Sequence, residues 1–325
     1  MVNSTLAAGD TPEHSIEAEK TEGKSLLSRS MQRSPFVSVG AVCDRERKVV
    51  QGISVQTDGH AVFAIENFVE IKLVSEVEGD PVEVAFAKVV SSFGGDPACF
   101  GVVGQNIADT PEILAELSGK PILHDFDQSD IDLGGQGGGA FDFLAFALAS
   151  MNSNLPETFA ILLVGESLRL VICDSSDKSI LKGGLIAFDI GAGWREGVWQ
   201  GPTAEIFKMR EPPRRYIIEN VRNQAQKGWE DILRNELETA FEFAGLRPQN
   251  VFVAGPDDLV CRVLSLIDLA TTERLGLVPA SYSAAAIAFC AARNFVSLPT
   301  SCPYNTGVAA PVGGAKIARP SALRP

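Results

Sequence analysis

Residues 125–139 of this chain read DFDQSDIDLGGQGGG. Four carboxylates fall within eight residues, and five glycines follow around Gln136. The carboxylates are Asp125, Asp127, Asp130 and Asp132, and the glycines are Gly134, Gly135, Gly137, Gly138 and Gly139. Because glycine lacks a Cβ atom, such a run lets backbone amides approach a ligand closely, and a positively polarised helix start is expected next, at residues 141–149. The stretch predicts a site for a phosphorylated or polyhydroxylated small molecule, with a flexible acidic turn as the alternative.

Composition limits the class of protein. At 325 residues the chain is long enough for two domains or one large one, and a hydrophobic content of 45% allows a sizeable core. The net charge of −13 repels phosphate backbones, so nucleic acid is not expected as a partner. The six cysteines and three histidines show no metal-ligand spacing, so no zinc site is expected.

The N-terminal segment, residues 1–34, is polar and carries both acidic and basic side chains. It lacks the apolar core of a signal peptide. No apolar run in the chain reaches the roughly 18 residues of a transmembrane helix. We therefore expect a disordered N-terminal arm, no membrane partner and a cytoplasmic protein.

Two stretches of the chain repeat one pattern of strands followed by alternating helices and strands. In residues 35–155, strands are expected at 36–42, 48–55, 61–65, 69–74, 99–103 and 121–126, and helices at 82–93, 111–118 and 141–149. In residues 156–325, strands are expected at 159–164, 168–174, 185–189 and 251–254, and helices within 214–245, 259–270 and 283–295. The pattern predicts two α/β domains, the first with the acidic, glycine-rich site and the second with a nucleotide phosphate turn. Residues 298–325 show little regular pattern.

A second glycine-rich turn follows the strand expected at 185–189 and reads Asp189-Ile190-Gly191-Ala192-Gly193. Strand–Asp-x-Gly-x-Gly turns bind phosphates in the actin-like superfamily. The carboxylate there orients a magnesium ion or water, and the glycines admit phosphates to backbone amides. Since Asp-x-Gly also ends many ordinary strands, this turn indicates phosphate binding only together with other motifs.

Several segments, in the correct order, resemble the anhydro-N-acetylmuramic acid kinases. The segment from His124 to Gly137 is similar to the family's Asp-Phe-Arg motif with its following aspartate and Gly-Gly-Gln-Gly. The segment from Phe188 to Gly193 is similar to its Phe-Asp-Thr-Gly-Pro-Gly turn. Weaker similarities lie at residues 110–119, 251–255, 283–293 and 298–307, so the resemblance spans residues 98–320.

The resemblance implies a fold, an activity and a set of site residues. The fold is α/β, a two-domain actin-like (ribonuclease H-like) sugar kinase fold with mixed sheets flanked by helices and a shortened N-terminal domain. The activity is hydrolysis of a 1,6-anhydro bond with phosphorylation of O6 by ATP and Mg²⁺, as in the recycling of cell-wall amino sugars, and such kinases often form homodimers. Asp130 matches the catalytic base. The implied substrate-binding residues are Asp125, Gly135, Gln136 and Gly137, and the implied nucleotide-binding residues are Asp189, Gly191, Gly193 and Gly255, with Asp189 also on the magnesium ion.

The departures from the family concern phosphate binding. Residues 36–44 read FVSVGAVCD and lack the serine, threonine and second glycine of the family's first phosphate loop. Asp127 replaces an arginine, and Pro256-Asp257 replaces two glycines of the nucleotide loop. Added negative charge weakens ATP binding. The sequence therefore leaves three hypotheses: a working sugar kinase, a catalytically impaired pseudokinase that binds a sugar or a protein, and an unrelated acidic α/β protein.

Overall fold

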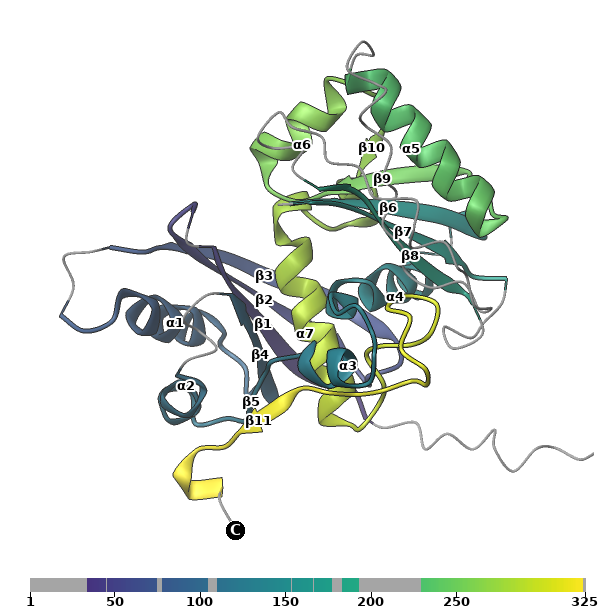
Figure 1. Cartoon of the computed structure of the whole chain (residues 1–325). Coiled ribbons are helices and arrows are strands. Elements are labelled where there is room, and N and C mark those ends of the chain that lie inside the picture. The colour runs from purple at the N-terminus through teal and green to yellow at the C-terminus, as the bar shows by residue number, and fades with distance from the viewer. Residues whose placement is uncertain are drawn as a thin grey trace, which may run out of the picture. The chain divides into compact units, whose positions relative to one another are not determined.

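The computed structural model describes residues 34–44, 46–74, 78–104, 110–152, 154–165, 167–176, 183–192 and 229–323. These residues belong to one unit that begins at Ser34. It contains two β-sheets with helices on their faces (Figure 1).

The first sheet has six strands in the order β11-β5-β4-β1-β2-β3. Three of them form an antiparallel meander, namely β1 (Phe36–Asp44), β2 (Val49–Thr57) and β3 (Val62–Lys72). Two strands then extend the sheet parallel to β1, namely β4 (Cys99–Gly104) and β5 (Ile122–His124). The last strand, β11 (Lys316–Ala318), pairs antiparallel with β5 at the edge.

The second sheet repeats this order with five strands, β10-β9-β6-β7-β8. Its antiparallel meander consists of β6 (Thr158–Val164), β7 (Ser167–Asp174) and β8 (Leu185–Ala192). Two strands parallel to β6 follow, β9 (Asn250–Ala254) and β10 (Ala270–Thr271). A meander extended by two parallel strands, present twice in one chain, is the arrangement of the actin-like (ribonuclease H-like) fold, so the predicted fold class is confirmed.

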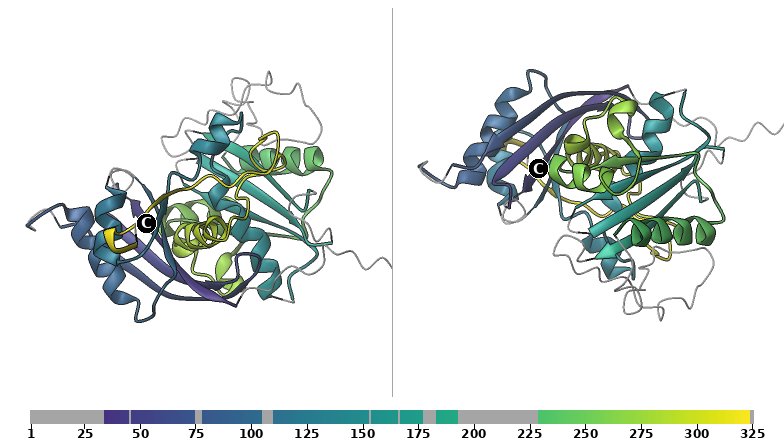
Figure 2. Two further views of the ribbon diagram at one scale, coloured as in Figure 1. Left: turned by 90° about the horizontal axis from the view of Figure 1, so that it is seen from below. Right: turned by 90° about the horizontal axis from the view of Figure 1, so that it is seen from above.

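Helices cover both sheets. On the first sheet, α1 (Pro81–Ser92) and α2 (Pro111–Ser118) lie on one face and α7 (Tyr282–Phe295) lies on the other (Figures 1 and 2). The second sheet packs against α5 (Trp229–Ala244) and α6 (Asp257–Leu264) on one side and against α4 (Phe143–Met151) on the other. One hydrophobic core therefore lies between the two sheets and includes residues of α4 and α7.

Close packing of α7 on the first sheet depends on small residues. The helix reads YSAAAIAFCAARNF, and eleven of its residues are buried. A Cβ atom at Gly40 in β1 would overlap the backbone of Ala284 and Ala288, and one at Gly101 in β4 would lie 2.7 Å from the carbonyl oxygen of Ile287. The two glycines therefore permit a helix-to-sheet distance that any larger residue would prevent.

Most of the predicted helices and strands are present, but some limits differ and the shortest elements were not predicted. The helix predicted at 111–118 is confirmed, and it ends at Gly119 with a left-handed backbone. The strand patterns at 61–65 and 69–74 form one strand, β3, and the helix expected at 259–270 ends at Leu264. Among the α-helices and β-strands of the described residues, three were not predicted: α3 (Gln128–Asp132), β10 and β11. Each has five residues or fewer, too few for a hydrophobic period to develop.

Candidate functional site

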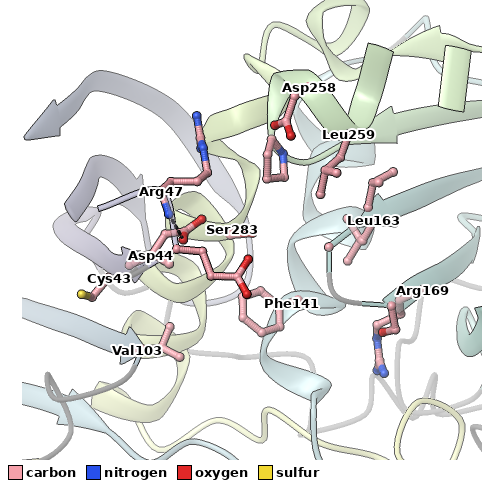
Figure 3. A pocket seen from close by; sticks show the side chains of 17 residues that line it. Cys43, Asp44, Arg47, Val103, Phe141, Leu163, Arg169, Asp258, Leu259 and Ser283 are labelled. Atoms are coloured by element: carbon pink, nitrogen blue, oxygen red, sulfur yellow. Dashed lines mark hydrogen bonds between the residues drawn. The ribbon is translucent and has the colours of Figure 1, made fainter. Parts of the chain in front are cut away.

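A cavity of about 630 Å³ lies between the β1–β2 turn of the first sheet and the β6–β7 turn of the second sheet (Figure 3). Its wall contains the carboxyl ends of β1, β4 and β6, the start of β7 and the loop between β9 and α6. Ligand sites in α/β sheets lie at such strand ends. The lining residues are Val42, Cys43, Asp44, Glu46, Arg47, Val103, Gly104, Phe141, Leu163, Val164, Gly165, Ser167, Arg169, Pro256, Asp258, Leu259 and Ser283.

The β1–β2 turn brings two carboxylates, Asp44 and Glu46, to the cavity. The backbone amide of Arg47 donates to Asp44 Oδ1 at 2.9 Å. That amide already donates to a carboxylate of its own turn, so it is not free to donate to a phosphate. The Arg47 guanidinium lies 3.8 Å from Glu70 on β3, and both side chains are about one-third exposed, so this ion pair is weak.

Gly255 lies beside the cavity, at the end of β9. Its φ is +142°, and a Cβ atom there would overlap the carbonyl oxygen of Val164 at the end of β6. Its amide donates to Pro279 O at 3.0 Å. The glycine predicted for the nucleotide loop is thus required by a close approach between two chain segments that both reach the cavity wall.

Arg169 on β7 joins two buried carboxylates. Its Nε donates to Asp142 Oδ1 at 2.6 Å, and its second terminal nitrogen donates to Asp142 Oδ2. Its other terminal nitrogen lies 3.4 Å from Asp189 Oδ1. Arg169 is only 6% exposed, so this bidentate pair is shielded from water. Buried charges need such partners, because water cannot solvate them.

The structure describes only part of the predicted phosphate turn, residues 189–192. Asp189 is buried beside Arg169, and Gly191 pairs with Leu168 of β7. Gly193 lies outside the described residues. No group of three or more His, Cys, Asp or Glu side chains in the described part of the chain is placed to hold a metal ion. Asp189 as a magnesium ligand stays a prediction.

The glycine loop differs from the expectation that its amides are open to a ligand. The backbone amides of residues 134–138 all donate to atoms of the protein, at 2.7–2.9 Å. Their acceptors, in order, are Ile131 O, Asp130 O, Thr306 O, Asp130 Oδ2 and Asp127 Oδ1. The acidic stretch forms α3, which brings its own carboxylates to these amides. A Cβ atom at Gly135 would overlap the Asp130 carboxylate, so that glycine is required.

Asp130, the predicted base, is fully buried. Its Oδ1 accepts from the Thr306 hydroxyl at 2.5 Å and its Oδ2 from the Gly137 amide at 2.8 Å. One donor on each oxygen fixes the orientation of the carboxylate. The structure brings Asp130, Gly135, Gln136 and Gly137 into one cluster, whereas Asp125 pairs with Lys316 of β11 at 2.5 Å.

Four residues of these clusters were not predicted: Asp142, Arg169, Asn305 and Thr306. Arg169 had a signal, because a charged residue interrupts the otherwise apolar strand SLRLVICD. Asp142 directly precedes the first helical residue of α4. For Asn305 and Thr306 the only signal was their place in residues 298–307, one of the segments with weaker similarity to the family.

Sequence comparison finds similarity to proteins named as kinases. No protein-family model matches the chain. It is 26% identical to anhydro-N-acetylmuramic acid kinase 1 of Jannaschia sp. (strain CCS1), over 76% of this chain and 80% of that protein. It is 25% identical to the anhydro-N-acetylmuramic acid kinase of Roseobacter denitrificans, over 91% of this chain and 97% of that protein. The polyphosphate/ATP-glucomannokinase of Arthrobacter sp. strain KM covers 79% of this chain and 97% of its own at 12% identity, with a TM-score of 0.36.

In the part of the chain that the structure describes, no helix combines the length and the apolar character needed to cross a membrane.

Proposed function

We propose that this protein is an ATP-dependent carbohydrate kinase, a phosphotransferase with an alcohol group as acceptor. The observation that carries the proposal is the cavity between the β1–β2 and β6–β7 turns, at the carboxyl ends of β1, β4 and β6 and beside the loop after β9. The sequence similarity to two anhydro-N-acetylmuramic acid kinases supports an amino sugar of that type as the substrate. Such an activity belongs to amino sugar metabolism and cell-wall sugar recycling.

The nucleotide is proposed to bind in the cavity. Gly255 and the turn that contains Asp189, Gly191 and Gly193 are the proposed nucleotide-binding residues. Gly255 directly precedes Pro256, which lines the cavity, and Asp189 contacts Arg169, which also lines it. Magnesium would enter with the phosphates of ATP, and Asp189 is the carboxylate proposed for it. The ion would neutralise phosphate charge. Asp189 Oδ1 also lies 3.4 Å from a terminal nitrogen of Arg169, which would hold the carboxylate in place.

Asp130 is the proposed general base, with Asp125, Gly135, Gln136 and Gly137 as the proposed sugar-binding residues. Asp130 accepts a proton from water, and the water oxygen bonds to the anomeric carbon. The bond between that carbon and O6 breaks, O6 bonds to the γ-phosphorus, and ADP leaves. A base must reach the water whose proton it takes. Because Asp130 is fully buried, the glycine loop has to move before the reaction.

A second candidate is a pseudokinase that binds a sugar or a protein without turnover. Two observations favour it. Both oxygens of Asp130 are occupied by donors of the protein. The β1–β2 turn also presents Asp44 and Glu46 where a kinase needs donors for phosphate.

Magnesium-dependent ADP release from ATP with 1,6-anhydro-N-acetylmuramic acid tests the proposal. We expect release from the wild type and none from Asp130→Asn, with unchanged circular dichroism. Calorimetric titration with Mg·ATP separates the candidates, because the pseudokinase predicts little or no binding. Sugar-dependent turnover that survives in Asp130→Asn would remove this residue as the base.

A further inference from the structure

Two sets of buried hydrogen bonds, linked through the peptide bond between Asn305 and Thr306, form a network that joins the glycine loop to the wall of the cavity. At one end, the Thr306 hydroxyl donates to Asp130 Oδ1 at 2.5 Å. Next to it in sequence, the Asn305 amide donates to Asp142 Oδ2 at 3.0 Å. Asp142 in turn accepts two hydrogen bonds from Arg169, which lines the cavity. Two neighbouring residues therefore connect the proposed sugar loop with the proposed nucleotide site.

Burial makes these bonds strong and their loss costly. Asp130, Asp142, Asn305 and Thr306 have no exposed surface. Water therefore does not compete for their hydrogen bonds, which are stronger in a medium of low dielectric constant. A buried carboxylate that lost its donor would have no solvent to replace it.

The turn of residues 302–306 determines the directions of both side chains. The amides of Asn305 and Thr306 donate to Cys302 O at 3.2 and 3.1 Å. The Cys302 amide donates to Asn305 Oδ1 at 2.8 Å, which leaves the Asn305 NH₂ group to face Asp142. A Cβ atom at Gly139 would lie 2.7 Å from the Thr306 methyl group, so the glycine loop packs directly on this turn.

We propose that Asn305 and Thr306 are positioning residues that align the Asp130 carboxylate with Arg169, so that the glycine loop and the cavity act as one site. The role of Asp130 as base in this inference rests on the proposed function. Thr306 orients Asp130, and Asn305 orients Asp142 and through it Arg169. Neither residue needs to touch a substrate.

Amide hydrogen exchange tests the network without any need for turnover. In Thr306→Val, whose side chain has nearly the same shape, we expect the amides of residues 134–138 to exchange at least about tenfold faster. Thr306→Ser keeps the hydroxyl and should exchange like the wild type. The matched control is Thr272→Val, because the Thr272 hydroxyl is equally buried and has no hydrogen-bond partner in the described structure. Unchanged exchange in Thr306→Val would overturn the proposal.

Asn305→Leu tests whether the two ends are connected. We expect faster exchange both in the glycine loop and in β7, which carries Arg169. An effect confined to residues 302–306 would contradict a joined network.

Kinetics then separates positioning from stability. We expect Thr306→Val to lower kcat by about tenfold or more while the KM for ATP changes less than about twofold, with kcat recovered in Thr306→Ser. A folded Thr306→Val with wild-type kcat would overturn the positioning role. If the wild type itself releases no ADP, the proposed kinase activity fails, and the two exchange experiments still decide whether the network exists.

Discussion

The two sheets place different chemistry at the same topological position. In each meander, the third residue of the middle strand faces a carboxylate on the outer strand. In the first sheet this pair is Gln51 with Glu70, joined by one hydrogen bond of 2.9 Å. In the second sheet it is Arg169 with Asp189, and Arg169 also binds Asp142. The second sheet thus contributes a buried cation, and the first contributes a neutral amide.

The difference extends to the turns at the cavity. The first sheet adds Asp44 and Glu46 with Arg47, whereas the second adds Gly165 and Ser167. The two sheets share a strand order but differ in these side chains, so strand order alone does not determine which side of the cavity can bind an anionic ligand. The charged side chains that line the cavity favour the second sheet slightly. Its side carries Arg169 and Asp258, whereas the first turn carries Asp44 and Glu46 with Arg47.

The largest expected effect comes from the two middle-strand residues. Arg169→Met removes the partner of the buried Asp142, and we expect it to lower the free energy of unfolding by about 3–5 kcal/mol. Gln51→Met is the matched change in the first sheet and should cost about 1 kcal/mol, because it removes one hydrogen bond to the partly exposed Glu70. Urea unfolding of both variants measures the difference, and equal losses would contradict the comparison.

A smaller effect concerns the helices that cover the two sheets. The buried residues of α1 on the first sheet are all apolar, whereas α5 on the second sheet buries Glu236 with neither oxygen hydrogen-bonded in the described structure. Burial raises the pKa of the Glu236 carboxyl to about 7. The folded state therefore favours the protonated form of Glu236. The contribution of this group to the free energy of unfolding should be at its maximum below about pH 4.5, fall between about pH 4.5 and 7, and remain constant above that range.

Glu236→Gln should remove this loss. We expect the variant to gain at most about 3 kcal/mol over the wild type between pH 5 and pH 8, measured by urea unfolding at both values. Glu242→Gln on the exposed face of the same helix is the control and should show no such change. A wild-type stability that does not fall over this pH range would show that Glu236 ionises normally.

The smallest effect concerns the acidic turn of the first sheet. Glu46→Gln removes one negative charge at the cavity without touching the bond between Asp44 and the Arg47 amide. We expect Mg·ATP to bind about two- to fivefold more tightly at low salt, with the gain reduced in about 0.5 M salt. Calorimetric titration checks this. The exposed Glu78 is not among the residues that line the cavity, so Glu78→Gln should leave the affinity unchanged.

Local pattern was sufficient for the elements with many residues. Apolar runs predicted the meander strands, and the helical pattern at 111–118 matches α2, which begins at Pro111 and ends before Gly119. The same reasoning located the acidic, glycine-rich loop, because its residues are close in sequence, and the family resemblance singled out Asp130 within it. It did not find Asn305 or Thr306, which reach that cluster from the far end of the chain.

The sequence by itself determined the α/β class, the repeat of one strand pattern and the position of the acidic, glycine-rich loop, since these depend on neighbours within a few residues. Only the tertiary structure decided that the loop's Gln136 amide binds Thr306 O, that Asp189 faces Arg169, and that β11 completes the first sheet. The physical reason is that these contacts join segments with large sequence separation. Such contacts stabilise the protein only when both segments are buried together in one core. The local pattern of apolar residues carries no information about which distant segments will meet.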